Sequence, residues 1–190
     1  SVQIRNMGTI GGNLCNASPA ADTAPPLLAL DAEARIAGPA GARQVPLEEF
    51  FVGPGRTVLG AGEILVEVSV PHLPEGAGAS FMKMRRTSVD IALVNVAAVL
   101  KLEGGVVADC RAALGSVAPT PVRAHRAEDS LKGREPTDEA LERAAYIASE
   151  EISPITDLRA TAEYRRAASR ALLRDALTIA KRRIEEGMTI

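Results

Sequence analysis

Cysteine, histidine and aromatic residues are scarce in this sequence. Its 190 residues include two cysteines, two histidines and no tryptophan, and aromatic residues make up 3%. Cys15 and Cys110 alone cannot build a disulfide framework or a cysteine-rich iron–sulfur or zinc site within this chain. Neither His72 nor His125 has a metal-ligating companion at useful spacing, so we assign no metal. A reducing compartment is the simplest explanation for so few cysteines, and we therefore expect a cytoplasmic protein.

Long apolar runs and an excess of one charge are also absent. No stretch is long enough to span a bilayer, and the first residues lack the basic and apolar regions of a signal peptide. The formal net charge is -2 and the pI is near 5.8, which gives no electrostatic case for binding nucleic acid or an anionic membrane. Hydrophobic residues at 46% and charged residues at 24% are normal for a globular protein with one large or two small domains.

A glycine-rich stretch near the start carries the strongest functional pattern. Gly8, Gly11 and Gly12 permit sharp turns and positive φ, so a ligand can approach the backbone without a Cβ in the way. Thr9 and Asn13 flank the paired glycines with a hydroxyl and an amide. Exposed N–H groups and short polar side chains that converge on one point can cradle a phosphate. The stretch therefore predicts a site for a phosphate-bearing cofactor.

Asp22 extends this pattern beyond the glycines. Its carboxylate is an acceptor of the kind that binds a ribose or ribityl hydroxyl. The stretch matches neither G-x-x-x-x-G-K-[ST] nor G-x-G-x-x-G, the two best-known nucleotide motifs. Taken alone, a doubled glycine is more often a bulge or a tight turn between strands than part of a ligand site.

The longer sequence around the paired glycines favours a ligand site over a simple bulge or turn. Residues 5–13 (RNMGTIGGN) and 17–22 (ASPAAD) closely resemble the second FAD-binding motif in the flavin subunit of molybdenum hydroxylases, the family of xanthine dehydrogenase and carbon monoxide dehydrogenase. Far along the chain, residues 153–159 (SPITDLR) and 162–166 (AEYRR) resemble the signature that opens the last helix of the same family's C-terminal domain. Two motifs in family order are more specific than either alone, and the resemblance covers the whole chain.

The first part of the chain is predicted to be mostly strands. Periodicity and turn residues predict a short buried helix at residues 24–30 and two short strands at 34–36 and 44–46. They also predict one helical turn at 47–51 and a longer strand at 64–70. In the last of these, Ile64, Val66, Val68 and Val70 alternate with other residues, which indicates a half-buried strand. The segment from Pro71 to Gly78 is the best candidate for a domain boundary.

The second part is predicted to pass from strands to helices. A strand at 80–84 precedes an antiparallel hairpin of residues 92–102 and 106–115, which has one apolar face and turns at two glycines. Three helices are then expected: one at residues 122–132, one that begins after a cap at Thr137, and one over residues 161–186. We interpret the many arginines of the last helix as a solvated face. Strands followed by helices indicate an α+β fold.

The resemblance also implies domains and a missing segment. Residues 1–73 would be the C-terminal part of a PCMH-type FAD-binding domain, and residues 77–190 an α+β sandwich like the C-terminal domain of CO dehydrogenase flavoprotein. The family holds FAD between two glycine-rich loops, and the first belongs to an N-terminal segment that precedes Ser1. Because the chain opens without an initiator methionine just before its best motif, we expect a fragment, or one chain of a subunit, that requires this segment to hold FAD fully.

Site residues follow from the resemblance as well. It implies cofactor contacts at Thr9, Ile10, Gly11, Gly12, Asn13, Asp22, Ile64, Leu65 and Lys83, and no catalytic side chain. By pattern alone, Ile64 and Leu65 are core strand residues, whereas Lys83 and Asp90 are charges at strand ends. In the family a matching lysine lies close to the flavin, where it would place positive charge near the negative charge that reduction creates. Asp90 is carried over from the same segment.

The implied function is electron transfer. A molybdopterin-binding large subunit would hydroxylate the substrate, a small subunit with two [2Fe–2S] clusters would relay electrons, and FAD on this subunit would pass them to an external acceptor. One alternative is a non-catalytic subunit-docking fragment that does not hold FAD on its own. Another is a free-standing flavoprotein with its own small substrate, although the signature at residues 157–166 argues against it.

Overall fold

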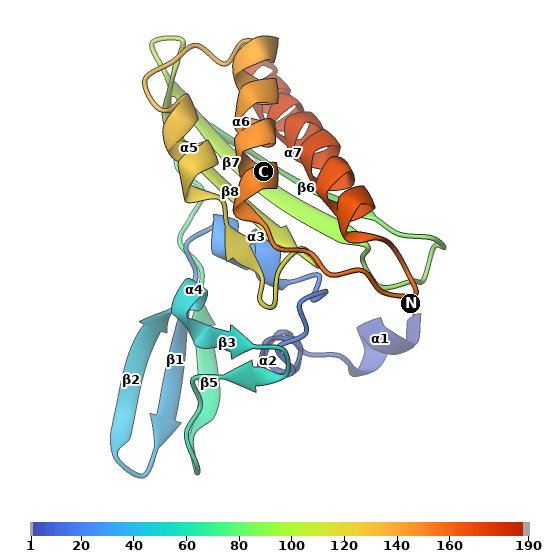
Figure 1. The fold of residues 1–190 in the computed structure, drawn as a ribbon. Helices are drawn as coiled ribbons and strands as arrows, with labels where there is room; N and C mark the ends of the chain where they lie inside the picture. The colour runs from blue at the N-terminus through green and yellow to red at the C-terminus, as the bar shows by residue number, and fades with distance from the viewer. Residues whose placement is uncertain (1, 188–190) are drawn as a thin grey trace.

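The computed structural model describes residues 2–187 and has the predicted α+β fold (Figure 1). Strands dominate the first part of the chain and helices the last part. The elements in chain order are α1 Val2–Met7, α2 Ile10–Cys15, α3 Ala24–Ala29, β1 Glu33–Gly38, β2 Gly41–Pro46, α4 Leu47–Phe50, β3 Phe51–Gly53, β4 Arg56–Thr57, β5 Ile64–Ser69, β6 Ala77–Met84, β7 Val94–Glu103, β8 Val106–Gly115, β9 Val122–Arg123, α5 His125–Leu131, α6 Asp138–Glu151 and α7 Ala162–Glu185.

The larger sheet has the strand order β6-β7-β8-β9, and all neighbouring strands are antiparallel. Strands β7 and β8 form the predicted hairpin, in which Val96 faces Leu114. Gly104 and Gly105 form its turn, and both have positive φ, which glycine adopts without strain. The hairpin prediction is therefore confirmed, including its turn.

Helices α5, α6 and α7 cover one face of this sheet (Figure 1). Thr137 and Thr161 cap α6 and α7, because each hydroxyl accepts a hydrogen bond from the N–H group three residues later. Leu141 of α6 and Leu173 of α7 are fully buried in the same cluster as Leu100 of β7. The helices thus bury the apolar face that the alternation in β7 predicts.

The opposite face of the same sheet is buried too. Ala97 and Val99 of β7 and Ala113 of β8 belong to a second cluster with Leu28 and Ala29 of α3. The small alanine side chains let α3 lie close against the sheet, which increases the contact area of this layer. The sheet is therefore the middle layer of the molecule, whereas the sequence pattern predicts only one apolar face.

Helix α5 begins later than predicted. Residues 122–123 form strand β9, in which Val122 pairs with Leu114 and Arg123 with Ala113 of β8. These residues extend the sheet, and only then does the chain turn into a helix at His125. The predicted start at residue 122 is wrong because pairing with β8 overrides the local helical pattern.

The smaller sheet, β2-β1-β5, contains the predicted strand at residues 64–69, but its burial is not as predicted. Ile64 is 63% exposed and Val66 is 48% exposed. The register between β1 and β5 shifts at Val66, which has no partner opposite it in β1. A β-bulge reverses the alternation of faces, so Leu65 and Val68 turn to the inner cluster instead. The prediction that Ile64 is a core residue is therefore wrong.

The predicted domain boundary falls between β5 and β6. Residues 70–76 in this segment form no helix or strand. However, α3 and the larger sheet share one buried cluster across the two parts of the chain. The division into residues 1–73 and 77–190 stays a prediction.

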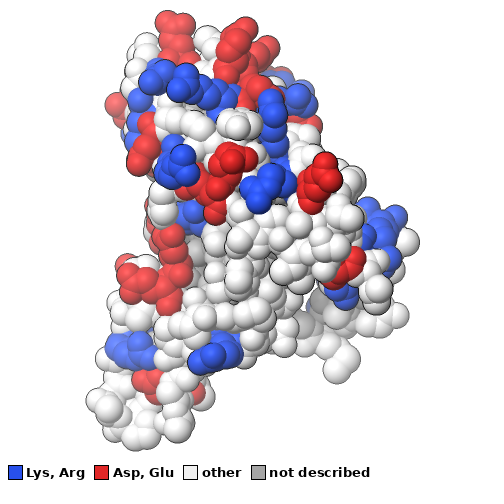
Figure 2. Space-filling model, viewed as in Figure 1, with Lys and Arg blue, Asp and Glu red and all other residues white. Residues whose placement is uncertain are grey.

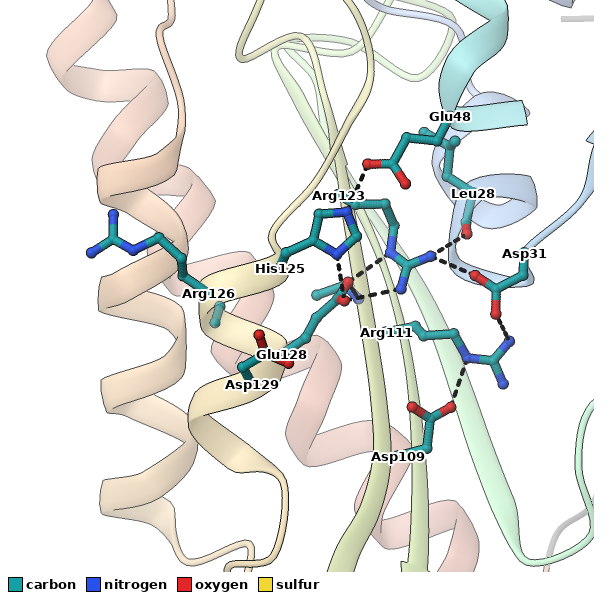
Figure 3. Close-up of polar contacts among 12 residues, drawn as sticks. Leu28, Asp31, Glu48, Asp109, Arg111, Arg123, His125, Arg126, Glu128 and Asp129 are labelled. Carbon is teal, nitrogen blue, oxygen red and sulfur yellow. Dashed lines mark hydrogen bonds and ion pairs between the residues drawn. The ribbon is translucent and has the colours of Figure 1, made fainter. Parts of the chain in front are cut away.

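A network of charged side chains also joins the two parts (Figure 3). Asp31, which follows α3, accepts hydrogen bonds from Arg111 Nη1 at 2.8 Å and from Arg123 Nη1 at 2.6 Å. Arg123 Nε in turn donates to Glu128 at 2.6 Å. Glu128 is 2% exposed and Arg111 7%, and charges so deeply buried require such partners. The network therefore fixes α3 against β8, β9 and α5; its members are Asp31, Glu48, Asp109, Arg111, Arg123, His125 and Glu128.

Candidate functional site

The glycine-rich stretch forms the start of a helix rather than a loop. Thr9 has an extended backbone just before α2, and its Oγ1 accepts a hydrogen bond from the Gly12 N–H at 3.0 Å. A Cβ on Gly12 would lie 2.9 Å from this oxygen, so glycine lets the cap form. Gly8, Gly11 and Gly12 all lack positive φ. The expectation of a left-handed turn is wrong here, because Thr9 directs the chain into a helix.

The start of α2 presents backbone donors. The first N–H groups of a helix have no acceptor within the helix, and the N–H of Gly12 is bonded to Thr9. The N–H groups of Ile10 and Gly11 are the other backbone donors at the start of this short helix, and a ligand could accept hydrogen bonds from them. A Cβ on Gly11 would lie 3.9 Å from the Leu65 side chain and meet no other atom within 4 Å. Leu65 of β5 therefore borders this helix start.

Asp22 and Lys83 meet although they lie 61 residues apart in the sequence. Lys83 Nζ is 2.6 Å from Asp22 Oδ2. The lysine side chain is 15% exposed and the aspartate side chain 49%, so the lysine stem is buried and the pair opens to the surface. Two predicted site residues from opposite ends of the candidate site thus form one ion pair.

One hydrogen bond connects this ion pair to α2. Thr23, which follows Asp22, donates from Oγ1 to Asn13 Oδ1 at 2.6 Å. Asn13 itself lies in α2, where its N–H bonds to the Thr9 carbonyl at 3.0 Å. Hydrogen bonds therefore join Thr9, Asn13 and Thr23, and Thr23 is the neighbour in the chain of Asp22, which pairs with Lys83.

Asn95 is a member of this cluster that the sequence reading missed. It is fully buried in β7, and its Nδ2 donates to Asp22 Oδ1 and to the Ala21 carbonyl, both at 3.2 Å. It is a single polar residue inside the apolar run of residues 91–100. That interruption is the signal that could have identified it.

Asp90 forms a separate contact. Its carboxylate accepts hydrogen bonds from Arg86 Nε at 2.9 Å and from the Ile91 N–H at 3.0 Å. The hydrogen bond from Arg86 lowers the pKa of Asp90, although partial burial opposes this effect. Asp90 therefore remains ionised in a local turn, and no contact joins it to Lys83 in the described part of the chain.

The second family-like motif is a structural joint. Asp157 Oδ1 accepts hydrogen bonds from the N–H groups of residues 159 and 160 and from Arg165 Nη2, at 2.9, 3.1 and 2.9 Å. Burial opposes ionisation, but these donors hold the pKa of Asp157 well below its usual range. Arg165 Nη1 also donates to the carbonyls of Leu93 and Ser116, at 2.6 and 3.0 Å. The motif therefore fastens α7 to the ends of β7 and β8.

The arginines of α7 fall into two groups. Arg170 and Arg174 have side chains 46% and 48% exposed and pair with Glu142 of α6, as expected for a solvated face. Arg165 is only 4% exposed, so that prediction is wrong for this residue. On the face shown in Figure 2, positive and negative side chains are interspersed over the helical half, and a mostly uncharged area with acidic side chains at its left edge lies between it and the smaller sheet. This face has no large patch of one sign.

The cysteines and metal candidates offer no reactive centre within residues 2–187. Burial, together with the charges of Glu128 and Asp109, raises the pKa of Cys110 to about 12, which keeps its thiol protonated. Burial also raises the pKa of Cys15. No group of three or more His, Cys, Asp and Glu residues in this range is arranged to hold a metal ion. None of the described helices is both long and apolar enough to cross a bilayer.

The donors and acceptors at this site fit a cofactor that carries phosphate and hydroxyl groups. The N–H groups at the start of α2 could hold a phosphate, since the missing side chain of Gly11 leaves the backbone open. Asp22 supplies an acceptor and Lys83 a donor for a neighbouring hydroxyl, 2.6 Å apart. On β5, Leu65 borders the start of α2, and its neighbour Ile64 is exposed.

Comparison with known families matches both parts of the chain. Residues 1–73 match the family described as the FAD binding domain in molybdopterin dehydrogenase, and residues 79–180 match the CO dehydrogenase flavoprotein C-terminal domain. The carbon monoxide dehydrogenase medium chain of Hydrogenophaga pseudoflava is 36% identical over 178 residues, which cover 94% of this chain and 62% of that protein. A putative xanthine dehydrogenase FAD-binding subunit of Escherichia coli K12 is 38% identical over 165 residues, 86% of this chain and 56% of that protein.

Solved structures show the same relationship. Carbon monoxide dehydrogenase from Hydrogenophaga pseudoflava matches with a TM-score of 0.94 and 38% identity over 96% of this chain and 64% of that chain. Quinoline 2-oxidoreductase from Pseudomonas putida 86 matches with a TM-score of 0.88 and 33% identity over 98% of this chain and 64% of that chain. The chain spans about three fifths of the length of the curated relatives it matches. Because both of its parts match in the same order, this chain belongs to the family of FAD-binding medium subunits of the molybdenum hydroxylases.

Proposed function

We propose that this chain is part of the flavin subunit of a molybdenum hydroxylase. In this proposal a molybdopterin-binding large subunit oxidises the substrate, a small subunit with [2Fe–2S] clusters relays the electrons, and the complex works in the cytoplasm. FAD, when bound, supplies the redox chemistry, since its ring system takes up electrons and delivers them to an external acceptor. The N-terminal segment with the first glycine-rich loop completes the site.

The contact between Asp22 and Lys83 is the observation that carries this proposal. It joins a residue of the glycine-rich motif to a residue of β6 that the sequence reading assigned to the same cofactor. The chain's role is to bind and orient the flavin through backbone and side-chain groups of Thr9, Ile10, Gly11, Gly12, Asn13, Asp22, Ile64, Leu65 and Lys83. The exposure of Ile64, at 63%, supports its role as a ligand contact.

Each polar group has a distinct task in this proposal. The N–H groups of Ile10 and Gly11 bind the diphosphate, while Thr9 maintains the helix start that orients them. Asp22 accepts a hydrogen bond from a ribityl hydroxyl. The Lys83 ammonium places a positive charge beside the flavin, which favours the reduced, more negative form. These tasks are binding and electrostatic tuning, and none of them requires a proton transfer.

Purification of the complex from its native source tests the proposal. We expect flavin absorbance together with a molybdenum subunit and an iron–sulfur subunit, identified by mass spectrometry. A colourless chain that purifies alone would overturn the proposal and favour a non-catalytic docking fragment.

A substitution refines this test. Replacing Lys83 with methionine should weaken FAD binding and shift the flavin reduction potential to a more negative value. Lys101→Met is the matched control, because Lys101 lies in the neighbouring strand β7 and pairs with Glu103 at 2.5 Å, away from the Asp22 cluster. An equal shift of the potential in both variants would contradict the assigned role of Lys83.

A further inference from the structure

Asn95 is an unusual residue to find near the start of β7, an inner strand of the larger sheet. Both of its neighbours in β7, Val94 and Val96, are fully buried in the apolar cluster beneath the helices. Asn95 points to the opposite face and is itself 0% exposed. A buried amide in an apolar sheet destabilises the protein unless its polar atoms find partners.

The Asn95 amide is only half satisfied. Its Nδ2 donates two hydrogen bonds at 3.2 Å, one to the Ala21 carbonyl and one to Asp22 Oδ1. Its Oδ1 is buried and has no hydrogen-bond partner within the described chain. An unpaired buried acceptor is unfavourable, and such a group in a folded protein calls for an explanation. The two hydrogen bonds from Nδ2, to Ala21 and Asp22, can explain why an amide with an unpaired oxygen is retained at this position.

Gly115 leaves room for the Asn95 side chain in this orientation. The two residues face each other across strands β7 and β8. A Cβ added to Gly115 would collide with Asn95 Oδ1 and would also come within 3.1 Å of Pro25. Any larger residue at position 115 would push the amide away from Asp22. The glycine therefore has a steric role that does not depend on positive φ.

The Asp22 carboxylate is consequently held at both oxygens. Oδ1 accepts from Asn95 at 3.2 Å and Oδ2 accepts from Lys83 at 2.6 Å, one from β7 and one from β6. Each carboxylate oxygen has two lone pairs, so each can accept a further hydrogen bond. Because the carboxylate is 49% exposed, these remaining positions face the surface. The two strands thus aim a fixed acceptor at whatever binds there.

We propose that Asn95, for which Gly115 leaves room, is a positioning residue that orients the Asp22 carboxylate toward a hydroxyl of the flavin's ribityl chain. This inference rests on the proposed function. Asn95 does not touch the cofactor itself; it acts through Asp22. In this way a residue in the middle layer of the molecule determines the geometry of a contact that Asp22 makes.

A double-mutant cycle on FAD affinity tests the proposal in the complete protein. The variants are Asn95→Ala, Asp22→Ala and the double variant, with FAD dissociation constants from absorbance titration and flavin circular dichroism as a second readout. Asn95→Ala should weaken FAD binding about tenfold, the size expected on losing one hydrogen bond to a charged group. In the Asp22→Ala background the same change should have little effect, because its target is already absent.

A purely structural role gives a different result. If Asn95 serves only to bind the Ala21 carbonyl, its loss should weaken FAD binding equally with and without the Asp22 side chain, and this additive result would overturn the proposal. Gly115→Ala should reproduce the Asn95→Ala loss, and unchanged FAD affinity in that variant would also overturn it. If the unmodified complete protein binds no FAD, the proposed function fails and this inference fails with it. If the unmodified protein binds FAD but the cycle is additive, only this inference fails.

Ser80→Ala is the control for general destabilisation. Ser80 is 7% exposed on the helix side of the same sheet, and its Oγ donates to the Ala176 carbonyl at 2.8 Å. Its loss should lower the thermal stability of the protein and leave FAD affinity unchanged. A loss of FAD affinity in Ser80→Ala as large as that in Asn95→Ala would mean that any weakening of the sheet disturbs the site, which would overturn a specific role for Asn95.

Discussion

The two sheets of this protein use their faces in different ways. The β6-β7-β8-β9 sheet is buried on both faces, with Leu100 toward the helices and Val99 toward α3. The β2-β1-β5 sheet is buried on one face only, and Ile64 and Val66 of its edge strand are 63% and 48% exposed. The candidate cofactor residues lie where the two regions meet. The comparison suggests that the larger sheet supplies rigidity and the smaller one supplies contact surface.

The largest expected effect tests this difference in burial directly. Leu173→Ala removes a fully buried side chain from the core beneath the larger sheet and should cost about 3–4 kcal/mol of the free energy of unfolding. Val66→Ala on β5 should cost less than about 0.5 kcal/mol, because its side chain is 48% exposed. Urea unfolding followed by circular dichroism measures both values. Similar losses in the two variants would show that the comparison is wrong.

The next effect concerns the joint between α7 and the larger sheet. Arg165→Ala should cost about 2–3 kcal/mol, because the carbonyls of Leu93 and Ser116 lose a charged donor in a buried setting. Arg170→Ala on the exposed side of the same helix should cost less than about 1 kcal/mol. Urea unfolding again provides the measurement. Arg165→Lys should not restore stability, because the single nitrogen of lysine cannot reach the acceptors that the separate Nη1 and Nη2 atoms of the planar guanidinium contact.

Two helix caps sharpen the comparison between the regions. Thr9→Ala and Thr161→Ala each remove a cap and should each lower the free energy of unfolding by about 1 kcal/mol. Only Thr9→Ala should also weaken FAD binding, since α2 and not α7 carries the proposed phosphate donors. Thermal unfolding and FAD titration separate the two effects. Thr9→Ser should retain both properties, and equal FAD affinities in the two alanine variants would argue against the α2 site.

The smallest effect is the pH dependence of the network between the regions. Burial opposes protonation of His125, but the hydrogen bond to Glu48 and the charge of Glu128 raise its pKa despite nearby Arg123. A raised pKa in the folded state means that protonated His125 stabilises the protein below about pH 6.5, and that this contribution disappears as pH rises through the folded-state pKa. The side chain is 56% exposed, so the contribution should stay below about 0.5 kcal/mol.

His125→Gln measures that contribution. Thermal unfolding of both proteins from about pH 6 to 8 should show a larger loss of stability in the unmodified protein than in the variant. Parallel curves for the two proteins would mean that His125 does not couple the regions electrostatically.

Local sequence was sufficient for many elements of the fold. The paired glycines at 104–105 predicted the turn of the hairpin, and Thr137 predicted the start of α6. Turns and caps depend on residues within a few positions of each other, so the sequence contains the whole interaction. The same approach was wrong at β5, because the bulge at Val66 arises from pairing with β1 rather than from β5 itself.

Part of the candidate site was also visible in the sequence. The string from Thr9 to Asp22 indicated a phosphate-bearing cofactor, and the resemblance to a known family added Lys83. The prediction that the glycines adopt positive φ was wrong because the Thr9 cap, once formed, favours a helix. Nothing in the local pattern around Lys83 indicated which carboxylate it would meet.

By itself, the sequence determined the turn of the hairpin at residues 104–105, the cap of α6 and the polar character of the glycine-rich stretch, because these depend on neighbouring residues. Only the tertiary structure decided that Lys83 reaches Asp22, that Arg165 is buried, and that Asn95 fits against Gly115. Each of these contacts joins residues far apart in the chain, and its geometry depends on how the larger sheet packs between α3 and α7. Long-range packing is therefore what turns separate motifs into one candidate site.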